Sequence, residues 1–209
     1  MTTSRPSCSW TATVGSSSPW LRLDAGGSGT GSGTVTFSAS ANAGGPRAGG
    51  LTIAGRGGTV GQAGAPSGPG VRRYPAEGAS TGFLDTRLAL LNPGDLPTTA
   101  LLTYQRADDA PVAAAVPVPA RTRVTVDPRV SFGGQPAEFA TVVESDQPLV
   151  VDRTMTWDVG GRYGAHAETA VEGPSPTWYL AEGATHSGFD LFYLLQNPGN
   201  TPTTVRVRY

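Results

Sequence analysis

The chain has 209 residues, a formal net charge of −1 and only 15% charged residues, beside 29 glycines and 18 prolines. This composition argues against helical bundles, and so small a net charge excludes recognition of nucleic acid by bulk electrostatics. All 15 basic residues are arginine and Cys8 is the sole cysteine. A P-loop lysine, a Schiff base, an internal disulfide and a four-cysteine zinc site are therefore excluded.

Residues 1–64 alternate short apolar runs with Gly/Ser clusters, a pattern typical of strands and turns. The runs are CSWTATV, WLRL, GTVTFSASA and GGLTIAG. The stretch GGSGTGSGT precedes a strand, and we interpret it as a flexible hairpin connection. Glycine and proline are then concentrated up to residue 70. We predict a first β-domain over 1–64 and a linker over 65–70, with few contacts between the units on its two sides.

Residues 71–172 contain a further series of runs with strand character. In PLVVDRTMTW the side chains of Val151, Arg153, Met155 and Trp157 are expected to share one face. The preceding ESDQP is typical of a turn, which predicts a hairpin between this run and EFATVVES. No segment has a convincing helical period. We therefore predict an all-β chain of tandem immunoglobulin-like β-sandwich domains, the last one incomplete.

The sequence contains an internal repeat. Tyr74 aligns with Tyr179 and Tyr104 with Tyr209 without a gap, a constant offset of 105 residues. Both copies contain Ala-Glu-Gly-Ala and Asn-Pro-Gly. Proline followed by glycine predicts a type II turn in each copy, with the glycine at positive φ.

Residues 173–209 are interpreted as a truncated second copy of the repeat, a β-hairpin. In TTVRVRY, the side chains of Val205, Val207 and Tyr209 should face one way and those of the two arginines the other. A lone hairpin is marginally stable in water. We expect it to project from the preceding domain, with four side chains poorly buried: Phe192, Leu194, Val205 and Val207.

The first segment resembles a BACON domain, the Bacteroidetes-associated, carbohydrate-binding, often N-terminal module. The matching features are Cys8, Trp10, Trp20, the Gly/Ser loop before GTVTFS, Asn42, Arg47, LTIAG and Gln62. The resemblance implies an immunoglobulin-like sandwich and an exported protein. Family members usually have further strand sequence before the Cys-x-Trp pair, so the module is interpreted as clipped at its start.

The 105-residue unit resembles DUF5719-like domains, which occur in tandem in bacterial surface and secreted proteins and bring no known chemistry. The resemblance rests on YxAEGA, LxNPG and ESDQPLVVDRTM. Like the BACON resemblance, it implies an extracellular or cell-surface location within a longer polypeptide. The stretch MTTSRPSCSW lacks the apolar core of a signal peptide, so an export signal is expected upstream of this segment. No stretch approaches the ~18 apolar residues of a membrane helix.

Catalytic chemistry is not predicted. His166 and His186 lie in loop-like stretches without an acidic or cysteine partner at metal-ligand spacing, so we interpret them as surface loop residues. Glu77 and Glu182 occupy equivalent positions of successive repeats, which places them a domain apart and excludes joint action on one bond. A turn-stabilising role is expected for them. We predict no enzyme, metal site or cofactor.

Carbohydrate binding is the function that the sequence favours. Sugar rings stack on exposed indoles, which makes Trp20 and Trp10 candidates, with Asn42 and Arg47 as polar neighbours. The alternative for Trp10 is a core position, and Trp20 is expected to be the more exposed. The predicted function is a non-catalytic module of an exported protein that binds glycans or glycoproteins. A spacer or adhesin stalk without a ligand is the alternative.

Overall fold

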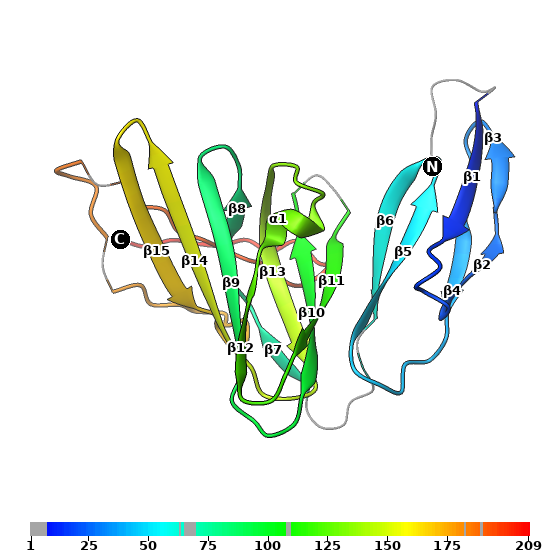
Figure 1. Cartoon of the computed structure of the whole chain (residues 1–209). Helices are drawn as coiled ribbons and strands as arrows, with labels where there is room; N and C mark the ends of the chain where they lie inside the picture. Colours follow the sequence, from blue (N-terminus) through cyan, green and yellow to red (C-terminus); the bar gives the residue numbers. More distant parts are fainter. Residues whose placement is uncertain (1–7, 63, 65–69, 108–109, 182, 189) are drawn as a thin grey trace.

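The structure is a computed structural model that describes residues 8–62, 64, 70–107, 110–181, 183–188 and 190–209 (Figure 1). The described residues form antiparallel sheets and a single short helix, so the predicted all-β class with sandwich-type domains is confirmed. Within the same residues, no helix has the length and apolar content needed to cross a bilayer. The predicted linker lies outside the described residues except for Gly70.

The first segment forms a small double layer of strands. Its strands are β1 Ser9–Val14, β2 Leu21–Ala25, β3 Ser28–Thr30, β4 Thr36–Ala39, β5 Arg47–Ile53 and β6 Arg56–Gln62. One sheet has the order β3-β1-β5-β6, and β2 pairs with β4 in the other. The buried apolar side chains of the described segment are few: Trp10, Ala12, Leu21, Pro46 and Leu51. With every residue of β4 exposed, this core is small and open.

The second segment is a larger two-sheet sandwich. Its elements are β7 Val71–Arg73, β8 Gly78–Ser80, β9 Leu84–Asn92, β10 Thr98–Gln105, β11 Val112–Val118, β12 Thr122–Val126, α1 Pro128–Ser131, β13 Ala137–Ser145, β14 Val150–Val159 and β15 Arg162–Thr169. One sheet has the order β11-β10-β13-β7, with β8 also paired to β13. The other has the order β12-β9-β14-β15.

The core of this sandwich lies between its two sheets. Alternate side chains are buried over residues 86–92 of β9, 98–104 of β10, 137–145 of β13 and 151–155 of β14, as expected for strands with one face in a core. At one end the rings of Tyr104, Phe132 and Phe139 pack together with centroids 5.1–5.3 Å apart. Val151, Arg153 and Met155 point inward as predicted, which places a charged side chain in an otherwise apolar row.

The predicted hairpin between EFATVVES and PLVVDRTMTW is wrong. These runs are β13 and β14, and β13 pairs with β10, β7 and β8 whereas β14 pairs with β9 and β15. The turn between them carries the chain from one sheet to the other. It is held by two side-chain hydrogen bonds, from Ser145 Oγ to the carbonyl oxygen of Gln147 and from Thr98 Oγ1 to Asp146.

The predicted type II turns are also wrong, because neither Gly94 nor Gly199 has positive φ. The asparagine side chain holds each turn instead. Asn92 Oδ1 accepts from the Gly94 amide at 2.9 Å, and its Nδ2 donates to the carbonyl oxygen of Leu96 at 2.8 Å. Asn197 makes the same pair of bonds at 3.1 and 2.8 Å. An Asx turn thus explains why asparagine, and not only Pro-Gly, recurs.

The expected hairpin over 173–209 has no strand ladder among its described residues. Phe192, Val205 and Val207 are exposed, as expected, and Leu194 is half-buried. In Figure 1 the tail runs in two arms behind the second sandwich. Gln196 links one arm of the tail to the second sandwich. Its Nε2 donates to Gln105 Oε1 and to the carbonyl oxygen of Thr141 in β13, both at 3.0 Å.

The first segment contacts the outer face of the second sandwich through β6. A Cβ on Gly61 would lie 2.9 Å from Cβ of Ala113 in β11 and 3.3 Å from Leu101 Cδ1 in β10. Only a glycine allows the two backbones to come this close. The contact lies outside the main hydrophobic core, whose buried members all fall between Leu88 and Ala170.

Replacing Asn92 should destabilise the second sandwich. Asn92 is fully buried and also donates to the carbonyl oxygen of Val118 at 3.3 Å. Asn92→Ala removes three hydrogen bonds to the backbone, one of them buried, and leaves a cavity, so we expect a loss of about 2–3 kcal/mol in the free energy of unfolding. Urea denaturation measures it. Asn197→Ala is the matched control, because its turn is exposed, and should cost less than about 0.5 kcal/mol. Equal losses would contradict the prediction.

Alkaline pH should destabilise the fold through Tyr104. Burial raises the pKa of Tyr104 to about 12, and the Ser131 side chain opposes the shift in part. The unfolded phenol has a pKa of about 10, so the contribution to stability is complete below pH 10 and is lost as the pH rises from about 10 to 12. The parent chain should lose about 2–3 kcal/mol in the free energy of unfolding over this interval, and Tyr104→Phe should not show this loss. The exposed Tyr163→Phe is the control; a pH profile of unfolding that is the same for both variants would refute the assignment.

Candidate functional site

Trp20 and Arg47 form a stacked pair on the first segment. The guanidinium carbon of Arg47, at the start of β5, lies 4.4 Å from the centroid of the Trp20 ring, just before β2. This distance is typical of a cation–π contact. A Cβ on Gly49 would lie only 2.8 Å from Trp20 Cζ2, so the indole also rests against bare backbone. Both side chains are half-buried, which leaves part of the stack exposed.

A hydrogen-bond network fixes the Arg47 guanidinium over the indole. Its Nε donates to Gln62 Oε1 at 2.9 Å, and its Nη2 donates to the carbonyl oxygen of Ser40 at 2.8 Å. Gln62 Nε2 donates to the same carbonyl oxygen at 3.0 Å. Nη1 of Arg47 makes no hydrogen bond within the described residues. The bonds of Nε and Nη2 therefore hold the guanidinium in one orientation.

Asn42 lies in the loop that Arg47 contacts, and its side chain bonds to the backbone of that loop. Its Nδ2 donates to the carbonyl oxygen of Gly45 at 2.8 Å, and its Oδ1 accepts from the Gly44 amide at 3.1 Å. Arg47 Nη2 approaches the carbonyl oxygen of the preceding residue, Ala41, at 3.4 Å. The structure thus brings Trp20, Arg47 and the Asn42 loop together.

Trp10 is a core residue, which was the alternative to a sugar-binding role in the sequence analysis. Its side chain is 8% exposed, and its Nε1 donates to the carbonyl oxygen of Gly31 at 2.9 Å. A Cβ on Gly29 or Gly33 would come within 2.6 Å of the indole. The glycine-rich stretch is therefore not simply a flexible connection, because part of it forms β3 and its missing side chains make room for the ring.

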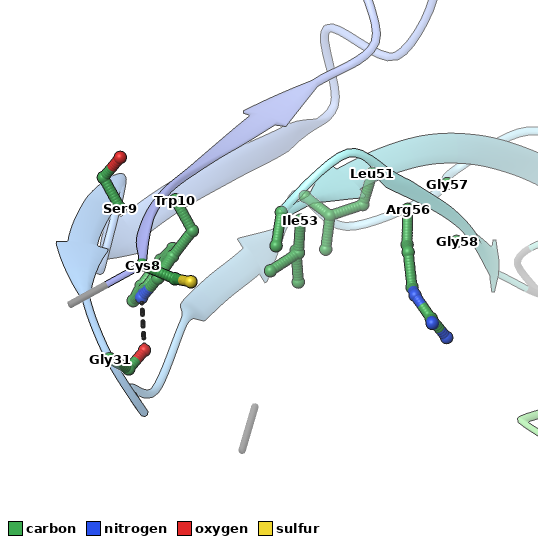
Figure 2. A pocket seen from close by; sticks show the side chains of 10 residues that line it. Cys8, Ser9, Trp10, Gly31, Leu51, Ile53, Arg56, Gly57 and Gly58 are labelled. Carbon is green, nitrogen blue, oxygen red and sulfur yellow. Dashed lines mark hydrogen bonds between the residues drawn. The ribbon is translucent and has the colours of Figure 1, made fainter. Parts of the chain in front are cut away.

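An open hollow of about 750 Å³ lies beside Trp10 (Figure 2). Leu51, Ile53 and Arg56 line it, together with the exposed thiol of Cys8. Its polar side chains do not converge on one point, and in the described part of the chain no three His, Cys, Asp or Glu side chains gather as a metal site. The hollow is the uncovered edge of the small core rather than a shaped ligand pocket.

A charged cluster in the second sandwich was not found from the sequence. Arg153 is 1% exposed, and its Nη1 lies 3.3 Å from Glu77 Oε2 while its Nη2 lies 3.1 Å from Glu168 Oε2. Nη2 also lies 2.7 Å from Nδ1 of His166. Arginine can only donate, so Nδ1 accepts and the ring proton of a neutral His166 is on Nε2. The cluster pairs both terminal nitrogens of the buried guanidinium, whereas Nε of Arg153 has no hydrogen-bond partner among the described residues.

Two interpretations from the sequence change as a result. Glu77 does not stabilise a turn but pairs with Arg153, 76 positions away, and His166 lies in β15 rather than in a loop. The available signal was the inward position of Arg153 between Val151 and Met155, since a buried guanidinium needs carboxylate partners. His186, by contrast, is exposed, and its Nδ1 lies 3.1 Å from Ser187 Oγ.

No protein-family model matches the sequence, and no curated protein matches it. Among solved structures, the crystal structure of Thermotoga maritima 1070 aligns with 50% of this chain and 97% of its own length. The sequence identity is 16% and the TM-score is 0.45. A likeness of this size carries no inference about function.

Removing one carboxylate from the charged cluster should destabilise the second sandwich. Glu77→Gln weakens a charge-assisted bond to a buried guanidinium, but the Glu77 side chain is 36% exposed and Glu168 remains. We expect a loss of about 1–2 kcal/mol in the free energy of unfolding, measured by urea denaturation. Glu172→Gln is the matched control, because the Glu172 carboxylate that pairs with Arg73 is 84% exposed, and it should cost less than about 0.5 kcal/mol. A silent Glu77→Gln would show that the pair contributes nothing to stability.

Proposed function

We propose that the chain is a non-catalytic module of an exported, multidomain bacterial protein that binds carbohydrate or glycoprotein through the Trp20–Arg47 stack. The observation that supports this is the guanidinium fixed over a half-exposed indole at 4.4 Å. Aromatic and guanidinium planes offer the apolar surface on which the CH face of a sugar ring packs. Nη1 of Arg47, which makes no hydrogen bond to the residues that the structure describes, adds a donor for a hydroxyl or carboxylate.

The arrangement needs little reorganisation to bind. Gln62 and the Ser40 carbonyl already hold the guanidinium, so its side-chain entropy is lost on folding rather than on binding. The location outside the cell, and the further domains of a longer polypeptide, follow from the resemblance to BACON and DUF5719-like modules. The same resemblance supports a glycan as the ligand.

A spacer without a ligand is the second candidate, and the packing of both tryptophans favours it. Trp10 is buried, and one face of Trp20 is already covered by Arg47. Both indoles therefore contribute to packing in a segment with few other core residues. The contact of β6 with β10 and β11 would suit a module that holds its neighbour at a fixed distance.

Binding to an immobilised glycan panel distinguishes the two functions. We expect the full chain to retain at least one glycan class. Trp20→Ala and Arg47→Ala should each weaken that binding by at least about tenfold, equivalent to about 1.4 kcal/mol. Trp178→Ala, which removes an exposed indole outside the stack, should bind like the parent chain.

Urea denaturation of each variant shows whether a loss of binding reflects unfolding. Retention of no glycan by the folded parent chain would favour the spacer. Undiminished binding by a folded Trp20→Ala variant would place the site elsewhere.

A further inference from the structure

The tail of the chain exposes a row of apolar side chains that the complete copy of the repeat buries. Leu195, Val205, Val207 and Tyr209, which we call the tail surface, are all exposed. Their counterparts at the 105-residue offset are Leu90, Ala100, Leu102 and Tyr104, each with 0% exposure. The same positions of the repeat are thus core in one copy and uncovered in the other.

The complete copy shows what covers these positions. Leu90 belongs to β9, which pairs with β12 on one side and β14 on the other. The other three belong to β10, which pairs with β11 and β13. All four of these neighbouring strands come from the part of the repeat after Tyr104, and the two sheets that they complete enclose the core between them. A segment of that kind is therefore the structural complement of the tail surface.

The tail already has part of the geometry that its counterpart has. The Asn197 turn repeats the hydrogen bonds of the Asn92 turn. The rings of Tyr193 and Tyr209 lie 6.2 Å apart, so the two arms run close together. The counterparts of these two rings, Leu88 and Tyr104, are both core residues. The arms are thus brought together around the turn but lack the partner strands that would complete a ladder.

We propose that the tail surface is a docking site for a β-segment with the strand pattern of residues 105–172. Such a segment would supply the equivalents of β11, β12, β13 and β14 and bury the tail surface as the core of a second sandwich. The tail does not bury this surface on its own domain, where Gln196 makes polar contacts to β10 and β13. A second copy of the chain fits less well, because its strands after Tyr104 already pair with its own β9 and β10.

The register of the proposed docking is fixed by the alternation of the last strand-like run. Val205 and Val207 occupy the positions of Ala100 and Leu102, which face the core. Arg206 and Arg208 occupy the positions of Leu101 and Thr103, on the opposite face of the strand. In the docked state the valines become buried while the arginines stay outside.

The test extends the full chain after Tyr209 with a second copy of residues 105–172 and follows amide hydrogen exchange. We expect exchange in residues 190–197 and 203–209 to become at least about 100-fold slower than in the parent chain, because these amides join a sheet. In the extended chain, Val207→Asp should abolish this protection. Arg208→Asp, which introduces the same charge at the next position on the outer face, should leave it intact.

Protection of residues 84–170 is the internal reference that each variant retains the first sandwich. Two results would overturn the proposal: the same exchange rates in the extended and the parent chain, or equal effects of the two aspartates. Concentration-dependent dimerisation of the parent chain in sedimentation, abolished by Val207→Asp, would show that the occupant is a second copy instead.

Discussion

The second sandwich depends on the burial of one guanidinium. Arg153 occupies an inward position of β14, where an unpaired charge would cost several kcal/mol. Glu77, Glu168 and His166 surround it, and they come from the segment before β8 and from β15. The bonds from Arg153 Nη1 to the side chain and backbone of Glu77 therefore tie the Ala-Glu-Gly-Ala motif to the sheet. Thr86 strengthens the same region by bonding both backbone groups of Ala79.

Glycines leave room for the tryptophan side chains. Trp10 lies against Gly29 and Gly33, Trp20 against Gly49, and Trp157 against Gly164. In each case a side chain at the glycine would occupy the space of the indole. Large rings can thus lie close to the backbone of the neighbouring segment. At these four positions, none of which has positive φ, the space that the indole needs explains the glycine better than backbone flexibility does.

The contrast between the two copies of the repeat separates local from tertiary stabilisation. The Asn-Pro-Gly turn forms in both copies because its hydrogen bonds lie within a few residues of one another. The ladders form only in the copy whose partner strands are present, since strand pairing and core burial need segments that are distant in the chain. Local chemistry thus determines the turn, and the neighbouring strands determine the sheet.

The sequence by itself determined the all-β class, the repeat, the inward row of β14 and the asparagine–glycine turn positions. Alternation and turn residues are local signals, and they are sufficient for these features. It did not determine which strands pair: the same turn residues serve a hairpin or a crossing between sheets, as the turn from β13 to β14 shows. Nor did it reveal that Arg47 stacks on Trp20, or that Glu77 neutralises Arg153. Those contacts join residues 27 and 76 positions apart, so only the packing of the sheets could bring them together.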